Sequence, residues 1–178
     1  MSNEDISMVC EVLLGITNTD KNIRTKSVNK LLELSNNLGA LTYCLIEIAS
    51  KNATNDKERI IKTTSLVICR KILTTKKEED WKKINNDLKE KIKINILNIL
   101  NLETDPSQNS KICDLIISIM DKVLESDEEW PQLFSLALSI CNYPPNDNSK
   151  LIQIRTLLKL LTGGAGYMYS QITKQFNN

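Results

Sequence analysis

The stretch that decides the fold runs from Ser110 to Leu138 and reads SKICDLIISIMDKVLESDEEWPQLFSLAL. Its first half carries apolar residues at the three- and four-residue spacing of a helix with one buried face, namely Ile112, Leu115, Ile116, Ile119, Met120, Val123 and Leu124. An acidic run at 127–129 follows, and Trp130-Pro131 then opens a second apolar segment, where proline suits the first helical position. The stretch therefore predicts a helix, a corner and another helix.

Apolar residues recur at helical spacing along nearly the whole chain, and a second clear stripe is formed by Ile84, Leu88, Ile92, Ile96 and Ile99. Short polar breaks separate the stripes. Asp20 is a candidate N-cap, Asp105-Pro106 resembles an N-cap followed by a first-turn proline, and NYPPNDNS at 142–149 is predicted to be a turn. The pattern predicts eight helices, at about residues 5–16, 20–35, 38–51, 57–74, 84–102, 107–125, 131–141 and 149–162.

The predicted helices fall into pairs that repeat at roughly 40–47 residues, which is the period of HEAT or armadillo arrays. Many of them have apolar residues on more than one side, as expected when a helix packs on its partner and on the next pair. We therefore predict an all-α protein, an α-solenoid of about four HEAT repeats in a right-handed superhelix, rather than a four-helix bundle. The repeats would span about 5–35, 38–74, 84–125 and 131–162 of a single array, and 163–178 would start a further repeat or form a loose end.

Composition excludes several classes of function. The 178 residues carry a net charge of +1, so no whole-molecule field favours nucleic acid or a membrane surface. The chain has no histidine, which removes the commonest general base and metal ligand. An odd number of widely spaced cysteines, each in an apolar stretch, indicates buried thiols in a reducing compartment: Cys10, Cys44, Cys69, Cys113 and Cys141. Without a signal peptide or an apolar run of about 20 residues, we expect a soluble, intracellular protein.

No group of residues suggests catalysis, a cofactor or a metal ion, so we expect no enzyme activity. The glycine cluster at 163–166 follows a helical stripe rather than a strand, which favours a turn or a loose end over a phosphate loop. The acidic run at 127–129 is interpreted as a helix-end corner, with a docking patch for a basic partner as the alternative. The densest basic stretch is predicted to be a solvated helix face: Lys82, Lys83, Lys89, Lys91 and Lys93. Trp81 and Trp130 are expected to fill gaps between repeats.

Two helical stretches are NIRTKSVNKLLEL at 22–34 and IKTTSLVICRKIL at 61–73. They resemble the first and second inner helices of the N-terminal HEAT repeats in the importin-β (karyopherin-β) superfamily, with Lys62 in place of the usual arginine and Ser65 in place of the usual alanine. Trp81 falls where many of these receptors carry an aromatic residue. ILNILNLETDPSQN, KICDLI, the acidic loop and WPQLF together resemble the third-to-fourth repeat junction of the importin-5 (karyopherin-β3) branch.

The resemblance covers about residues 5–141 and implies part of a nuclear transport receptor. In that family the N-terminal repeats bind the GTP form of the GTPase Ran through the second helix of each pair. Cargo proteins bind farther along, and Phe-Gly nucleoporins bind between outer helices, mostly in repeats that this chain does not contain. Such a protein would occupy cytoplasm and nucleus and bind neither nucleic acid nor membrane. The alternatives are a generic HEAT scaffold and a regulatory subunit of an enzyme complex.

If the second helix of each pair lines the binding wall, polar residues opposite its apolar stripe form the candidate Ran-binding set. These residues are Asn29, Glu33, Lys62, Arg70, Asp114, Ser118 and Asp121. The alternative is that each is a solvated side chain with no role. If these residues bind Ran, reversing the charges of Asp114 and Asp121 together should weaken Ran-GTP binding at least tenfold, by about 1.4 kcal/mol, and leave the melting temperature nearly unchanged.

Overall fold

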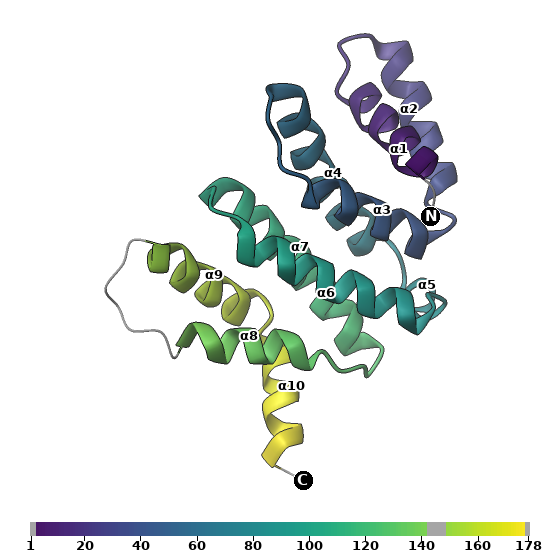
Figure 1. The fold of residues 1–178 in the computed structure, drawn as a ribbon. Coiled ribbons are helices and arrows are strands. Elements are labelled where there is room, and N and C mark those ends of the chain that lie inside the picture. Colours follow the sequence, from purple (N-terminus) through teal and green to yellow (C-terminus); the bar gives the residue numbers. More distant parts are fainter. Residues whose placement is uncertain (1–2, 142–148, 177–178) are drawn as a thin grey trace. The chain divides into compact units, whose positions relative to one another are not determined.

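The computed structural model describes residues 3–141 and 149–176, and within these ranges the chain is entirely helical apart from its turns (Figure 1). The helices are α1 (Asn3–Ile16), α2 (Lys21–Leu34), α3 (Leu38–Ser50), α4 (Asp56–Thr75), α5 (Glu78–Lys82), α6 (Asn86–Leu102), α7 (Pro106–Glu125), α8 (Pro131–Cys141), α9 (Ser149–Gly163) and α10 (Ala165–Phe176). Each of the eight predicted helices is present, with its ends within two residues of the expected positions. The all-α solenoid class is confirmed. Helix α5 was not predicted, and α10 occupies the segment that was expected to start a further repeat or form a loose end.

Two predicted N-caps explain where helices begin. Asp20 accepts hydrogen bonds from the backbone N–H groups of Asn22 and Ile23 at the start of α2. Asp105 does the same for Ser107 and Gln108 at the start of α7, where Pro106 occupies the first turn. These bonds satisfy amide groups that would otherwise lack an intrahelical partner. The predicted turn at 142–149 lies outside the described residues, apart from Ser149.

The described residues divide into two compact units at Asn95 and Ile96, and each unit is described separately. In the first unit, α1 packs on α2, α3 packs on α4, and α1 also contacts both α3 and α4. Its core is built from α1, α3 and α4, whose fully buried side chains include Leu13, Leu45, Ile46, Leu66 and Leu73. Trp81 of α5 is fully buried, and α5 contacts α3. By contrast, α2 has no buried residue.

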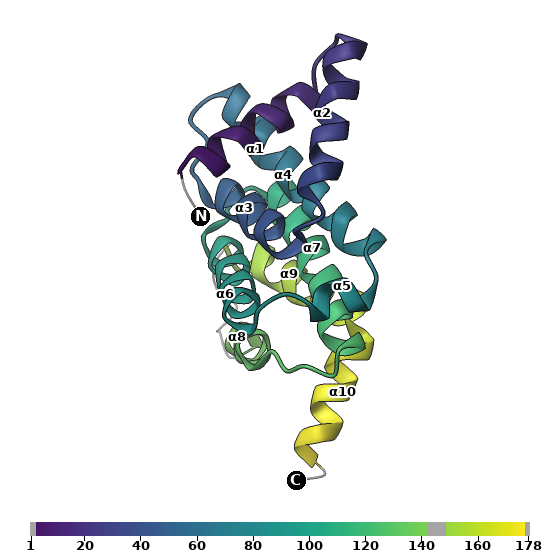
Figure 2. The same ribbon diagram turned by 90° about the vertical axis from the view of Figure 1, so that its right-hand side faces the viewer.

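In the second unit α7 is the central element. It packs on α9 and α10, while α8 packs on α9 (Figures 1 and 2). The α7–α9 contact includes a buried hydrogen bond of 2.7 Å from the Thr156 hydroxyl to Asn109, and an ion pair of 2.7 Å between Lys159 and Asp114. Gly163 and Gly164, which separate α9 from α10, leave no room for a Cβ beside Ile117 and Met120 of α7. The glycine cluster is therefore a turn that allows close packing on α7.

The acidic run is a helix-end corner, as expected. Asp127 adopts a positive φ of 52°, and its N–H bonds the Leu124 carbonyl at 3.1 Å. The N–H of Glu128 reaches back to the Val123 carbonyl at 2.9 Å, which completes a Schellman motif after α7. Lys174 of α10 lies 2.8 Å from Asp127. Trp130 follows the corner and is fully buried.

One prediction about the basic stretch was wrong. Lys89 and Lys93 are only 4% and 2% exposed, so α6 does not present a uniformly solvated basic face. Lys89 lies over the Trp81 ring, with 5.8 Å from Nζ to the ring centroid, and Lys93 pairs with Glu90 at 3.1 Å. Long aliphatic stems let lysine continue an apolar stripe while the ammonium group keeps a partner. Lys82, Lys83 and Lys91 are exposed, as predicted.

The described cysteines are free thiols, and Cys44, Cys69 and Cys113 are buried, as expected. Burial raises the pKa of Cys44 and of Cys113 to about 11, so both stay protonated at neutral pH. Cys10 is only half buried, and burial raises its pKa to a lesser degree. The side chain of Cys141 lies outside the described part of the structure.

Candidate binding surface

Charge in the first unit separates according to the order of the helices within each pair. The first helices, α1 and α3, carry Glu4, Asp5, Glu11 and Glu47 and no basic residue. The second helices carry nine basic residues against three acidic ones, and the basic set is Lys21, Arg24, Lys26, Lys30, Lys57, Arg59, Lys62, Arg70 and Lys71. The near-zero net charge of the chain hides this separation. In these two pairs the second helix is therefore the basic member and the first helix the acidic one.

The candidate Ran-binding residues of the first unit lie on these second helices. Asn29 and Glu33 are exposed and one turn apart on α2, and Glu33 pairs with Lys30 of the same helix at 2.9 Å. Arg70 is exposed on α4, whereas Lys62 is half buried. The surface of α2 also exposes apolar side chains, with Leu32 at 61% exposure and Val28 at 42%. A face that mixes charge with exposed aliphatic groups has the chemistry of a protein-binding surface.

The three candidate residues on α7 do not share one environment. Asp114 is half buried and held by Lys159 of α9. Ser118 is 5% exposed, and its hydroxyl donates to the backbone carbonyl of Asp114 at 3.1 Å. Asp121 is exposed, and its pKa is raised by partial desolvation and by Glu125, an effect that Lys122 opposes. Because reversing Asp114 would place a second lysine beside Lys159, the expectation that the double charge reversal leaves the melting temperature unchanged must be revised.

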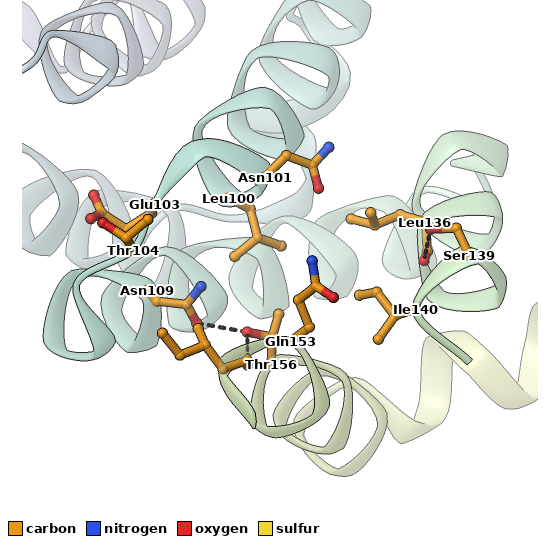
Figure 3. Close-up of a pocket in the computed structure, with 11 residues that line it drawn as sticks. Leu100, Asn101, Glu103, Thr104, Asn109, Leu136, Ser139, Ile140, Gln153 and Thr156 are labelled. Atoms are coloured by element: carbon orange, nitrogen blue, oxygen red, sulfur yellow. Dashed lines mark hydrogen bonds between the residues drawn. The ribbon is translucent and has the colours of Figure 1, made fainter. Parts of the chain in front are cut away.

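The second unit contains a cavity of about 420 Å³ between the end of α6, the start of α7, α8 and α9 (Figure 3). Its apolar side chains are Leu100, Leu136, Ile140 and Ile152. Its polar side chains are Asn101, Glu103, Thr104, Asn109, Ser139, Gln153 and Thr156. The Gln153 amide extends from α9 between Leu100 on one side and Leu136 and Ile140 on the other (Figure 3). Asn109 and Thr156 are bonded to each other, so they form a fixed wall.

The chemistry of this cavity suits an apolar side chain carried on a peptide. Among the described residues that line it, Glu103 alone is charged, so these residues offer a charged ligand little to bind. The aliphatic groups offer dispersion contacts, and the amides of Asn101 and Gln153 offer donors and acceptors for a peptide backbone. The sequence did not predict this site, because its lining residues come from four helices and are spread over more than 50 positions, from Leu100 to Thr156.

A second cavity, of about 520 Å³, lies in the first unit between the loop before α3 and the residues around α5. Its lining is more polar and includes Asn36, Asn37, Lys76, Asp80 and Lys83. Lys83 pairs with Asp80 at 3.3 Å, which lowers the pKa of Asp80 through a hydrogen bond and the nearby positive charge. Asp80 and Lys83 largely neutralise each other, which leaves Lys76 as the remaining charged group of the lining.

The described residues contain no cluster of three or more histidine, cysteine or acidic side chains placed to hold a metal ion. A search of the same part of the chain finds no helix that is both long and apolar enough to span a membrane.

No known family model matches the sequence. The fold resembles that of Kap121p bound to RanGTP, with a TM-score of 0.74 and 18% identity over 94% of this chain and 15% of that chain. It also resembles Kap121p bound to Nup53p, with a TM-score of 0.74 and 17% identity over 96% of this chain and 15% of that one. Kap95p, solved with Ran, matches with a TM-score of 0.70 and 21% identity over 90% of this chain and 19% of that chain.

These solved proteins are karyopherins of the importin-β family. At such low identity the likeness establishes a shared fold: a helical solenoid of the karyopherin type. The chain spans 15% to 19% of the length of the solved chains that it matches.

Proposed function

We propose that this chain is part of a nuclear transport receptor and that its paired helices bind Ran in the GTP form. The observation that supports this most directly is the fold itself, which matches Kap121p in its complex with RanGTP over 94% of this chain. The candidate residues lie on α2, α4 and α7, each the second helix of its pair. The protein would act as a carrier in cytoplasm and nucleus rather than as an enzyme.

The proposed mechanism is thermodynamic linkage between Ran-GTP and a cargo protein. A solenoid binds partners over an extended surface, so two partners that need different curvatures or overlapping surfaces compete. Each partner then lowers the affinity of the other by the same factor. The mixed charges and exposed aliphatic groups of α2 and α4 would contribute part of the Ran surface. The closer kinship to the importin-5 branch stays part of this proposal.

The test is a binding measurement with Ran locked in its GTP form and in its GDP form. We expect tighter binding of the GTP form, because a transport receptor must distinguish the two. A generic scaffold or a regulatory subunit would show no nucleotide preference, and that result would contradict the proposal.

The residue assignment needs a separate variant. Arg70→Glu combined with Asp121→Lys reverses one exposed charge of each sign on α4 and α7. We expect at least tenfold weaker Ran-GTP binding, about 1.4 kcal/mol, in a variant that circular dichroism shows to be folded. The matched control is Glu11→Lys with Lys91→Glu, which reverses exposed charges on the first helices α1 and α6. If both double variants bind Ran-GTP like the parent protein, the site assignment fails while the family hypothesis stands.

A second candidate partner is a Phe-Gly nucleoporin, and the cavity between α6 and α8 favours it. An apolar wall of Leu100, Leu136 and Ile140 with the Gln153 amide in its midst suits an aromatic side chain next to a flexible backbone. Ile140→Asp would introduce a charge into this wall. We expect a Phe-Gly peptide to bind the parent protein and not this variant, while Ran-GTP binding is retained. Equal peptide binding by both proteins would rule out the cavity.

A further inference from the structure

Helix α9 has a buried face and, opposite it, a row of apolar side chains that the described residues leave partly exposed. At 3.6 residues per turn, Leu151, Ile154, Leu158 and Leu161 fall within about 80° of one another. They are 40% to 56% exposed. On the opposite side, Thr156 and Leu160 are buried, at 4% and 0% exposure, and this side packs on α7. We call the exposed row of Leu151, Ile154, Leu158 and Leu161 the α9 stripe.

The α9 stripe has the pattern of a helix-packing surface. Its residues follow an i, i+3, i+7, i+10 spacing, which matches the ridge that one helix presents to another. Soluble proteins expose single aliphatic side chains often, but a regular row along one helix is the kind of contiguous patch that marks an interaction surface. Because α9 already packs on α7 through its other face, an occupant of the stripe would extend the same helix-on-helix packing.

The charged residues of α9 and α10 are all basic. From Ser149 to Asn178 the sequence contains no Asp or Glu, and its charged residues are Lys150, Arg155, Lys159 and Lys174. Lys159 is held by Asp114 of α7 and Lys174 by Asp127, so both are already neutralised. Arg155 is exposed and lies next to the stripe in helical phase. A partner that covers the stripe therefore needs negative charge along its edge.

We propose that the α9 stripe binds an amphipathic α-helix whose apolar row is flanked by aspartate and glutamate. The apolar row would pack on Leu151, Ile154, Leu158 and Leu161, and an acidic side chain would pair with Arg155. This inference goes beyond the proposed Ran-binding function, because none of the candidate Ran-binding residues lies on α9.

Charge argues against a second copy of this chain as the occupant. Two α9 stripes packed on each other would bring their Arg155 side chains to the same interface. The exposed aliphatic face of α2 is no better, because that helix is also basic and carries Lys21, Arg24, Lys26 and Lys30. Like charges opposed across a small apolar contact weaken it.

The test uses the 178-residue protein and two synthetic peptides of about 18 residues, roughly five helical turns. Both peptides carry the same leucine row, flanked by glutamate in one and by lysine in the other. Fluorescence anisotropy would measure their affinities at low and high salt. We expect the glutamate peptide to bind at least tenfold more tightly than the lysine peptide, with a preference that shrinks as salt screens the charges. Equal affinities, or no binding of the glutamate peptide, would overturn the proposal.

Variants locate the contact. Ile154→Glu with Leu158→Glu changes two exposed positions, so the fold should survive, as circular dichroism would check, and glutamate-peptide binding should be lost. Arg155→Glu should reverse the order of the two affinities, so that the lysine peptide binds more tightly than the glutamate peptide. The matched control is Val28→Glu with Leu32→Glu, which alters the exposed aliphatic face of α2 and should leave peptide binding unchanged. Loss of binding in the control variant would place the contact elsewhere and overturn the proposal.

Two further results would also overturn it. The first is a concentration-dependent dimer of the protein alone, measured by sedimentation, that the double variant Ile154→Glu with Leu158→Glu no longer forms. The occupant would then be a second copy of the chain. Binding to phosphatidylserine vesicles through the same residues, without binding of the glutamate peptide, would instead identify the stripe as a membrane surface.

Discussion

Helices α2 and α7 hold the same place in their pairs, yet their surroundings differ completely. No residue of α2 is buried, whereas ten residues of α7 are, including the polar Asn109, Ser118 and Lys122. The sequence periodicity predicts the same arrangement for both helices, because each carries an apolar stripe opposite a polar one. The difference teaches that a polar residue on a solenoid helix has a partner-binding role only if no neighbouring helix has already engaged it. On α2 the polar face is free of such contacts, and on α7 much of it is used internally.

The strongest test of this contrast is truncation of one aliphatic side chain on each helix. Ile119 of α7 is fully buried, so Ile119→Ala should lower the free energy of unfolding by about 2–5 kcal/mol through lost burial and a cavity. Leu32 of α2 is 61% exposed, and Leu32→Ala should cost less than about 1 kcal/mol. Urea denaturation of the two variants measures both values. Similar losses would mean that α2 is covered in solution.

The α1–α2 contact supplies the exception to the open surroundings of α2. Gly15 of α1 lies against Ser27 of α2, and a Cβ at Gly15 would collide with the Ser27 side chain. Gly15→Ala should therefore destabilise the protein by about 1–3 kcal/mol, although alanine is the better helix former. Gly166→Ala on α10 is the matched control, because its Cβ would meet Leu124 at an ordinary 3.4 Å, and it should stabilise by up to about 1 kcal/mol. Thermal unfolding of both variants would show opposite signs, and a stabilising Gly15→Ala would mean that α1 and α2 are less closely packed.

Asp114 tests whether a candidate binding residue on α7 is structural instead. Its ion pair with Lys159 joins α7 to α9 at 2.7 Å, with both side chains about two-thirds buried. Asp114→Lys should cost about 1–3 kcal/mol, since a charge-assisted bond is lost and two lysines face each other. Asp121 lies seven residues farther along α7 and is exposed, so Asp121→Lys should change the free energy of unfolding by less than about 0.5 kcal/mol.

The charge-swapped variant completes this experiment. Asp114→Lys combined with Lys159→Asp restores opposite charges and should recover much of the lost stability. If it does not, the ion pair is incidental, and Asp114 returns to the set of residues available to a partner.

The sequence predicted the helices well because their signals are local. The 3.6-residue period, the caps at Asp20 and Asp105 and the proline at 131 each depend on a few neighbouring residues. Helix α5 was missed because its five residues are too few to show a period. The alternatives for 163–178, a further repeat or a loose end, stayed open because the segment follows a glycine cluster, and the structure places α10 there. The candidate Ran-binding residues stay a prediction in every case.

Two of the environments that the sequence did not predict depend on contacts between different helices. Lys159 lies 45 positions after Asp114, and nothing in either segment indicates that they pair. Lys89 was expected to be solvated because its charge is evident in the sequence, whereas the ring of Trp81 that covers it comes from a separate short helix. The charge separation in the first unit was missed for another reason: it appears only when helices are sorted by their place in a pair.

The smallest expected effect concerns the ion pair between Asp127, at the end of α7, and Lys174 of α10. The corresponding ion pair of α2, between Lys30 and Glu33, lies within a single helix. The hydrogen bond and charge of Lys174 hold the pKa of Asp127 below its ordinary value, and Asp127 in turn raises the pKa of Lys174. Because the folded-state pKa of Asp127 is depressed, its contribution to stability is present above the unfolded-state pKa of about 4 and is lost as pH falls through the folded-state value. Both groups are largely accessible to solvent, so the effect on stability is small and screened by salt.

Carboxyl-carbon NMR titration of the parent protein and of Lys174→Gln measures the pKa of Asp127 directly. We expect this pKa to rise toward its ordinary value in the variant, and the difference between the two proteins to shrink in high salt. The control is Lys30→Gln on α2, which should leave the titration of Asp127 unchanged. An Asp127 pKa that does not respond to Lys174→Gln would mean that α10 is not held at the corner in solution.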